Sequence, residues 1–404
     1  MHLRARTVLL VSVALAVASS AAPALAAPGP ILSHAAAGDQ PLTWSIVPSP
    51  SAKAIINVLL GVSCASVSDC TAVGWHVHST KSPSRTLIES WNGTTWSIVP
   101  SPNPRLISSL DGVSCVSVND CTAVGSDSSI GMGPRTLILS WNGSTWARVP
   151  SPNAAPHSRG VNELHAVSCV SAAACTAVGS YLTRTGGSKT LIESWNGTTW
   201  SIVPSPNPEP SANVLLGVSC TSPAACTAVG SSLRRKGGGR VVVKTIVESW
   251  NGTTWSIVPS PNPEPAVNVL QGVSCATAAA CTAVGFSQTK THAQATPLIE
   301  SWDGTTWSVA PSPLLGGRLN GVSCTSLSDC TAVGFAASST LIESWDGTTW
   351  SVVSSPNEGS SSGLADVSCL PAATCTAAGT YGSSVSPYPD KTLVEVGSPS
   401  GAQR

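Results

Sequence analysis

Short apolar runs, broken by Gly, Asn and Pro, recur along the chain from residue 42 onward. In residues 340–350 (TLIESWDGTTW), Asp-Gly separates two such runs. Runs of this length that are rich in β-branched residues favour strands over helices. Asn-Gly and Asp-Gly tolerate the positive φ angles of a type I′ turn, so each copy predicts a two-residue hairpin. The other close copies of the turn lie at residues 91–96, 141–146, 195–200, 250–255 and 302–307.

The hairpins belong to a longer repeat of about fifty residues, a period typical of propeller blades with four strands each. The first predicted strand ends in Val-Ser-Cys, and the second begins with Cys-Thr-Ala. The third strand reads Thr-Leu-Ile-Glu-Ser-Trp, and the fourth reads Trp-Ser-Ile-Val-Pro. Proline cannot donate a hydrogen bond to a neighbouring strand, so the fourth strand is predicted to lie at the outer edge of the blade.

The two ends of the repeat region are incomplete in complementary ways. Residues 42–50, around Trp44, form a fourth strand with no strands before it, whereas residues 364–395 supply only the first three. Joined together, they make one more blade. The sequence therefore predicts an all-β, seven-bladed β-propeller over residues 41–398, with four antiparallel strands per blade, closed by the N-terminal strand pairing with the C-terminal blade.

Cysteines mark every repeat, and their total of fourteen is even. A pair flanking a five-residue loop between two antiparallel strands can reach the Cα separation of about 5.5 Å that suits a disulfide. Zinc is not expected, because the spacing is wrong and no histidine accompanies the pairs. The predicted disulfides are Cys64–Cys70, Cys115–Cys121, Cys169–Cys175, Cys220–Cys226, Cys275–Cys281, Cys324–Cys330 and Cys369–Cys375.

The N-terminus has a charged start, an apolar centre and the small-residue site Ala24-Leu25-Ala26. This pattern predicts a signal peptide over residues 1–26, followed by a flexible segment at 27–40, and residues 399–404 are predicted to be a disordered tail. A secreted monomer without membrane insertion is expected. Twenty basic and twenty acidic residues cancel, so nucleic acid is not an expected partner, and no cofactor is predicted.

The Ser-Trp-Asp-Gly-Thr-Thr-Trp segments resemble a shortened Asp-box, the hairpin of sialidase-type and photosystem-assembly-factor-type propellers. The whole unit also resembles a group of secreted bacterial repeat proteins with paired cysteines and no assigned activity. Sialidases use three arginines and a tyrosine paired with a glutamate. No arginine trio occupies matching strand positions here, and Tyr181, Tyr381 and Tyr388 are expected in loops. The resemblance therefore implies the fold but no catalytic residues.

One glutamate recurs at a single position of the third strand, with Leu139 as the exception. Paired carboxylates could perform acid-base hydrolysis. A residue repeated around a ring is better explained by architecture, so hydrogen bonds between blades are expected to satisfy these side chains. They are Glu89, Glu193, Glu248, Glu300, Glu343 and Glu395.

The loops between strands two and three and between strands four and one vary most, so any ligand site is predicted on that face. The second position of strand one also varies there, and its residues are expected at a channel mouth: Leu60, Asp111, His165, Leu216, Gln271, Asn320 and Ala365. Asp111, His165, Gln271 and Asn320 are the candidate binding residues of this set. Arg234 and Arg235, in a predicted loop over residues 233–244, form a candidate anion site. His76 and His78 share a strand face, but no third metal ligand is evident, so no metal site is predicted.

The favoured interpretation is a secreted, non-catalytic binding or scaffold module for an extracellular glycan or protein. The alternative is an exported glycan-active hydrolase or lyase. Two carboxylates or a metal set on the variable face, absent from the other repeats, would favour the enzyme.

Overall fold

The computed structural model describes residues 42–156, 159–184, 186–235, 237, 240–289, 294–371, 374–382 and 390–399. All of them belong to one compact unit, Gln40–Arg404. In these ranges the chain forms strands and no α-helix. The predicted leader at residues 1–26, the segment at 27–40 and nearly all of the predicted tail lie outside the described residues.

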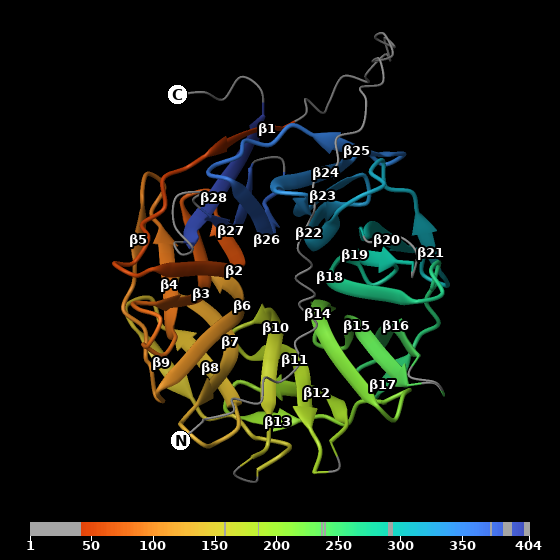
Figure 1. Cartoon of the computed structure of the whole chain (residues 1–404), viewed down its shortest axis with the longest axis horizontal. Helices are drawn as coiled ribbons and strands as arrows, with labels where there is room; N and C mark the ends of the chain where they lie inside the picture. The colour runs from red at the N-terminus through yellow and green to blue at the C-terminus, as the bar shows by residue number, and fades with distance from the viewer. Residues whose placement is uncertain are drawn as a thin grey trace. The chain divides into compact units, whose positions relative to one another are not determined.

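The strands form repeated four-stranded blades (Figure 1). Blades 1 and 2 comprise β2 (Ile56–Ser66), β3 (Asp69–Val77), β4 (Arg85–Trp91) and β5 (Trp96–Ile98), then β6 (Ile107–Ser117), β7 (Asp120–Ser128), β8 (Arg135–Trp141) and β9 (Trp146–Val149). Blades 3 and 4 comprise β10 (Asn162–Ser171), β11 (Ala174–Leu182), β12 (Ser188–Trp195) and β13 (Trp200–Ile202), then β14 (Ala212–Ser222), β15 (Ala225–Arg235), β16 (Val241–Trp250) and β17 (Trp255–Ile257). Blades 5 and 6 comprise β18 (Val267–Thr277), β19 (Ala280–Gln288), β20 (Thr296–Trp302) and β21 (Trp307–Ala310), then β22 (Arg318–Ser326), β23 (Asp329–Ala336), β24 (Ser339–Trp345) and β25 (Trp350–Val353).

The terminal blade combines the two ends of the chain. Strands β26 (Ser361–Cys369), β27 (Cys375–Gly382) and β28 (Asp390–Pro399) come from the C-terminal part, and β1 (Leu42–Ile46) pairs antiparallel with β28. Trp44 lies opposite Gly397, at the place where the other blades pair two tryptophans. A Cβ atom on Gly397 would lie 2.7 Å from the Trp44 ring, so only glycine fits beneath that indole.

The core lies between the faces of neighbouring blades. Leu137 and Trp146 of blade 2, for example, pack with Val73 and Ile88 of blade 1. Figure 1 shows the blades arranged radially, with the first strand of each nearest the centre. These innermost strands contact one another in the order β2, β6, β10, β14, β18, β22, β26, and β26 in turn contacts β2.

Backbone pairing groups the blades into separate sheets of eight, twelve, four and four strands, rather than one continuous sheet. Hydrogen bonds that serine side chains accept connect the blades as well. In each step a cysteine backbone N–H donates, at 2.9–3.0 Å, to a serine Oγ of the preceding blade. The serine–cysteine pairs are Ser63–Cys115, Ser114–Cys169, Ser168–Cys220, Ser219–Cys275, Ser274–Cys324, Ser323–Cys369 and Ser368–Cys64.

The turn between strands three and four differs from the predicted type I′ hairpin. Gly93 has a φ of 92°, but Asn92 does not adopt a positive φ. Instead, the Asn92 Oδ1 atom accepts hydrogen bonds from the backbone N–H groups of Thr94 and Thr95, both at 2.9 Å. The type I′ prediction is therefore wrong, because the Asn side chain takes the place of a backbone carbonyl as the turn acceptor.

All seven predicted disulfides are confirmed. Their surroundings differ from the expectation. Cys64 and Cys70 lie directly opposite each other in the β2–β3 pair, which continues to Ser66 and Asp69. The connection is thus two residues long, and the Cα atoms are 3.9 Å apart rather than about 5.5 Å. Seven such bonds indicate an oxidising, extracellular type of environment.

Candidate functional site

The varied position of strand one lies inside the strand, which corrects the predicted place at its end. Strand β6 begins at Ile107, and its pairing with β7 shifts register between Leu110 and Gly112, so Asp111 is the extra residue of a β-bulge. The first strand of each other blade has the same register shift, and the extra residues of these bulges are Leu60, His165, Leu216, Gln271, Asn320 and Ala365.

The bulges bring two of the candidate residues together. The His165 Nδ1 atom lies 3.3 Å from the Asp111 Oδ2 atom, and their side chains are 15% and 26% exposed. Burial alone would lower the pKa of His165, but the hydrogen bond to Asp111 and the charges of Asp111 and Glu163 raise it. Burial raises the pKa of Glu163, against the opposing charge of His165. A carboxylate, an imidazole and a second carboxylate therefore share the boundary of blades 2 and 3.

The other candidate residues do not join this group. Asn320 donates from Nδ2 to the backbone oxygen of Leu364 at 2.8 Å, which ties blade 6 to the terminal blade. Gln271 lies half-buried at the equivalent position of blade 5. Arg234 and Arg235 end strand β15 rather than lying in a loop, which corrects the predicted loop boundary. Arg234 is 61% exposed on its side chain, and its Nε atom lies 3.8 Å from a Glu209 carboxylate oxygen.

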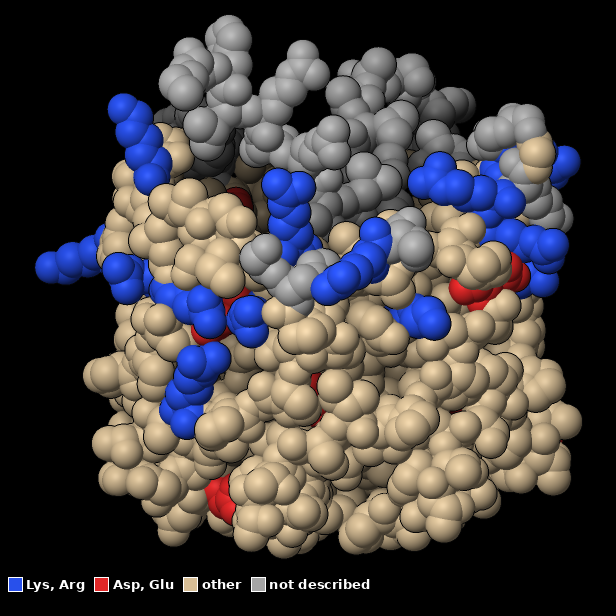
Figure 2. Space-filling model, turned by 90° about the horizontal axis from the view of Figure 1, so that it is seen from below, with Lys and Arg blue, Asp and Glu red and all other residues tan. Residues whose placement is uncertain are grey.

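Charge is distributed unevenly between the two ends of the strands. Every described lysine and arginine except Arg148 lies at the end that carries the two-three and four-one loops, hereafter the variable face (Figure 2). They are Lys53, Lys81, Arg85, Arg105, Arg135, Arg159, Arg184, Lys189, Arg234, Arg235, Arg240, Lys244, Arg318 and Lys391. The turns at the opposite end carry Asp69, Asp120, Asp303, Asp329 and Asp346. Glu209, Glu264, Glu358 and Asp390 also lie at the variable face, but the cations there outnumber them, so the net charge of zero conceals a basic face and an acidic face.

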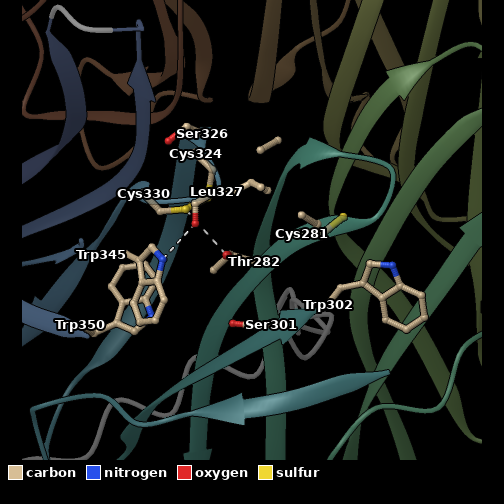
Figure 3. A pocket seen from close by; sticks show the side chains of 12 residues that line it. Cys281, Thr282, Ser301, Trp302, Cys324, Ser326, Leu327, Cys330, Trp345 and Trp350 are labelled. Atoms are coloured by element: carbon tan, nitrogen blue, oxygen red, sulfur yellow. Dashed lines mark hydrogen bonds between the residues drawn. A yellow bond between two sulfur atoms is a disulfide. The ribbon is translucent and has the colours of Figure 1, made fainter. Parts of the chain in front are cut away.

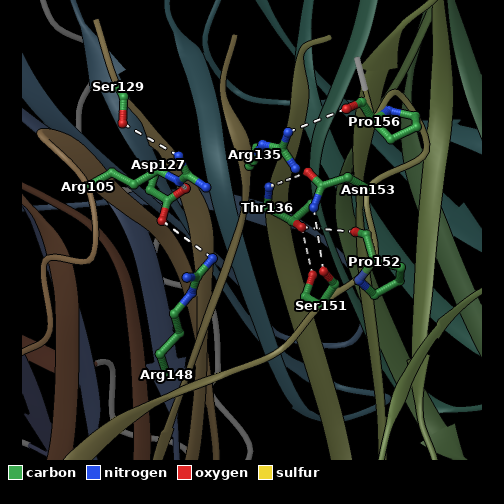
Figure 4. Close-up of polar contacts among 10 residues, drawn as sticks. All are labelled: Arg105, Asp127, Ser129, Arg135, Thr136, Arg148, Ser151, Pro152, Asn153 and Pro156. Carbon is green, nitrogen blue, oxygen red and sulfur yellow. Dashed lines mark hydrogen bonds and ion pairs between the residues drawn. The ribbon is translucent and has the colours of Figure 1, made fainter. Parts of the chain in front are cut away.

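Blade 2 carries a buried ionic cluster that the sequence did not predict (Figure 4). The Asp127 side chain is fully buried, and Oδ1 lies 3.0 Å from Arg105 Nε while Oδ2 lies 3.7 Å from Arg148 Nη2. Burial raises the pKa of Asp127, and the charges of Arg148 and Arg105 oppose that shift. Blade 2 is also the blade in which Leu139 replaces the recurrent glutamate. Arg148 of this cluster lies opposite Leu139 in the β8–β9 pair, so the cluster places charge beside the one position of the repeat that has no carboxylate.

The change Asp127→Ala should lower the free energy of unfolding by about 3 kcal/mol, the low end for a buried ion pair, because Arg105 and Arg148 lose their counter-ion but are themselves partly exposed. Chemical denaturation of the purified chain measures this change. The variant Asp127→Ala/Arg148→Ile should recover part of the loss, since Ile98 and Ile202 occupy the equivalent position in blades 1 and 3. A single variant as stable as the parent would show that the cluster contributes nothing.

The recurrent glutamates are fully buried, as their role in architecture requires. Each accepts a hydrogen bond of 2.5–2.9 Å from a serine that follows strand four of the preceding blade, which confirms the predicted contacts between blades. The pairs are Ser49–Glu89, Ser151–Glu193, Ser205–Glu248, Ser260–Glu300, Ser312–Glu343 and Ser355–Glu395. Among the described residues, the second carboxyl oxygen has no hydrogen-bond partner in five of the six, so these contacts satisfy only part of each side chain. Burial raises the pKa of Glu193 and Glu248 to about 8 and that of the other four to about 7.

The two histidines of blade 1 and the tyrosines complete the set of predicted residues. The rings of His76 and His78 meet edge to face at a centroid distance of 4.8 Å, and no group of three potential metal ligands occurs among the described residues. Burial lowers the pKa of His76, and the nearby charges of His78 and Arg85 lower it further. Tyr181 and Tyr381 lie in strands β11 and β27, so their predicted loop placement is wrong, and Tyr388 lies outside the described residues.

A crevice at the acidic end, between blades 5 and 6, is lined by Trp302, Trp345, Thr282 and Leu327 (Figure 3). The Trp345 Nε1–H group donates to the Leu327 oxygen at 3.2 Å. Trp91 and Trp141 make the same bond to Val67 and Val118 in blades 1 and 2. Because the arrangement repeats from blade to blade, it is part of the fold and not a singular site.

Comparison with known proteins identifies the fold. No protein-family model and no curated protein matches the chain. A solved structure described as YCF48 bound to D1 peptide is 11% identical, with 90% of this chain and 97% of that chain covered and a TM-score of 0.53. YCF48 from Cyanidioschyzon merolae is 12% identical, with coverages of 87% and 98% and a TM-score of 0.49. The first likeness and the repeated four-stranded blades define the chain as a β-propeller. No described helix has the length and apolar character needed to cross a membrane.

Proposed function

We propose that this chain is a secreted, disulfide-stabilised β-propeller of seven blades that binds a protein partner on its variable face. Closure through the terminal blade is supported by the pairing of Trp44 with Gly397 and by the Cys64 N–H group, which donates to Ser368 across that boundary. Contacts between a threonine Oγ1 atom and a cysteine Sγ atom also join each blade to the next. The contact at the boundary of the terminal blade and blade 1 joins Thr376 Oγ1 to Cys70 Sγ at 3.8 Å.

The proposed domain limits follow the sequence. Residues 1–26 would be removed as a signal peptide, residues 27–40 would form a flexible segment, and the propeller would span residues 41–398, followed by a tail at 399–404. The seven disulfides support export, because such bonds persist in oxidising compartments. The folded unit is proposed to be a monomer in solution.

The separation of charge is the observation that carries the binding function. The acidic end repeats the same turns from blade to blade, whereas the variable face concentrates the cations and the loops that differ. Binding residues are commonly placed on loops over a rigid scaffold. A solved neighbour with the same fold is described as bound to a peptide, which supports a polypeptide partner.

An array of extracellular peptides and glycans, probed with the purified chain, tests this proposal. Peptide binding is expected to weaken when Lys81, Arg184 and Arg240 on the variable face are replaced together by serine, because the positive charge of that face falls. The opposite-face variant Val67→Ser/Leu327→Ser, at positions 57% and 66% exposed, should bind as the parent does. Binding that depends on the opposite face, or on glycan alone, would contradict the proposal.

A glycan-active hydrolase or lyase is a second candidate, favoured by one observation. Asp111, Glu163 and His165 place two carboxylates beside an imidazole, and no other repeat has titratable residues at both equivalent positions. Incubation with a polysaccharide panel tests this candidate. Turnover by the parent should be lost in Asp111→Asn and retained in Gln271→Ala.

A further inference from the structure

Blade 2 exposes a group of large apolar side chains on the variable face. Ile130 and Met132 are 80% and 37% exposed in the loop between β7 and β8, and Leu106 and Ile107 are 41% and 43% exposed where the chain enters β6. The equivalents of Ile107 are Ile56 in blade 1, Val161 in blade 3, Ala212 in blade 4 and Val267 in blade 5, and all four are buried or half-buried. Exposed apolar groups of this size, when they gather, mark interaction surfaces.

These side chains come from segments that lie side by side. Ile107 pairs with Ser128, immediately before the Ile130 loop, and Arg105 Nη1 lies 3.5 Å from Ser129 Oγ. The loop also touches blade 3, since a Cβ atom on Gly133 would lie only 2.0 Å from the Gly160 oxygen. The apolar residues therefore form one surface that reaches the neighbouring blade.

Cations border this surface. Arg159, which is exposed, precedes Gly160 at the contact with the loop, and Arg135 begins β8 directly after it. The Arg135 Nη2 group donates to the Pro156 oxygen at 3.4 Å (Figure 4). Its charge acts on Asp127 across the β7–β8 pair, but the close ion pairs of that carboxylate are with Arg105 and Arg148. We call Leu106, Ile107, Ile130, Met132, Arg135 and Arg159 the blade 2 patch.

We propose that the blade 2 patch is the docking surface for an extended polypeptide segment that presents apolar side chains beside carboxylates. This inference rests on the proposed function and specifies the partner's chemistry. The apolar residues supply area that association removes from water, and the guanidinium groups are complementary to carboxylates. Met132 fits this role, because an unbranched thioether adapts to different apolar shapes.

Met132 is also a built-in reporter, since the chain contains only two methionines and the other is Met1. The full chain can be labelled with ¹³C-methyl methionine, and Met132→Leu assigns the signal. The probe is a short synthetic peptide that alternates Leu and Asp. Matched peptides alternate Leu with Lys, or Ser with Asp. Only the Leu-Asp peptide is expected to shift the Met132 methyl resonance.

Affinity measurements by fluorescence anisotropy quantify the contributions. Ile130→Ser/Met132→Ser should raise the Kd for the Leu-Asp peptide about tenfold or more, and Arg159→Glu should raise it several-fold. The control changes Leu315→Ser and Lys244→Glu alter an 87% exposed leucine of blade 6 and an exposed cation of blade 4, and should leave the Kd unchanged.

Three results would overturn the proposal: an unchanged Kd for the Ile130 and Met132 double variant, equal binding of the Leu-Lys peptide, or self-association of the free chain that this double variant abolishes. The last result would identify a second copy as the occupant. If the array yields a peptide whose binding survives the double variant, the proposed function stands while the blade 2 patch is excluded.

Discussion

The thermal unfolding midpoint of this protein should fall as the pH rises from about 5 to about 8. Six buried glutamates have folded-state pKa values of about 7 to 8, against an ordinary value of 4.5. Between these limits the folded chain binds more protons than the unfolded chain, so stability decreases with pH. Their contribution is complete below about pH 4.5 and is lost as the pH passes through 7 to 8. Each unit of raised pKa is worth about 1.4 kcal/mol, so the six groups together should lose on the order of 10 kcal/mol across this range, which calorimetry measures.

A single substitution isolates the cause. Glu248 accepts its bond from Ser205 and is fully buried, so Glu248→Gln keeps the shape and removes one titrating group. This variant should lose less stability than the parent between pH 5 and pH 8, by up to about 1.4 kcal/mol for each unit by which the pKa was raised. Asp329→Asn, at an exposed acid that begins strand β23, is the matched control. A midpoint that rises from pH 5 to pH 8 would contradict the assignment.

The repeated elements of this fold were predictable because each side chain in them meets the same neighbours in every blade. The incomplete ends at Trp44 and Leu364 predicted that the N-terminal strand pairs with the C-terminal blade, and β1 does pair with β28. The recurrent glutamates were recognisable for the same reason. A residue that makes the same contact in every blade recurs at a regular spacing in the sequence.

Local geometry was harder to predict, since different backbone conformations share the same residue pattern. The Asn-Gly pair is compatible with a type I′ turn, but the Asn92 side chain accepts the turn hydrogen bonds instead. The Leu-x-Gly segment marks a bulge that moves Asp111 into the strand. A Cβ atom on Gly112 would lie 3.0 Å from the His165 backbone oxygen, so the close contact between the two blades explains the glycine at this position. The sequence alone does not show which residue lies against it.

The features that distinguish blades were the least predictable. Leu139 was visible as an exception to the glutamate repeat, but Arg105, Asp127 and Arg148 come from three separate segments that only folding brings together. The basic face was also not predicted, because the net charge counts the charged residues but not where they lie in the fold. A site that occurs in only one blade depends on contacts between segments far apart in the sequence. Such contacts produce no repeating pattern.

Reduction of the seven disulfides should unfold the chain at room temperature. Each bond joins cysteines six positions apart, and closing so short a loop stabilises the folded state by about 2 kcal/mol in the chain-entropy model. Seven such contributions total on the order of 15 kcal/mol, which equals or exceeds the net stability of an ordinary domain. The chain should therefore fail to refold when it is diluted from guanidinium with a reductant present. Tryptophan emission is a direct measurement, because Trp96 and its equivalents are buried in the folded state.

The free energy of unfolding should decrease stepwise as single disulfides are removed. This stepwise decrease distinguishes the contribution of each bond from a general effect of the reductant. Cys169→Ala/Cys175→Ala removes one bond in blade 3 and should lower the free energy of unfolding by about 2 kcal/mol while the other six bonds keep the chain folded. A second pair, Cys324→Ala/Cys330→Ala in blade 6, should add a similar decrement, since blades 4 and 5 separate the two sites. A reduced chain that regains native tryptophan emission would show that packing between blades is sufficient without the disulfides.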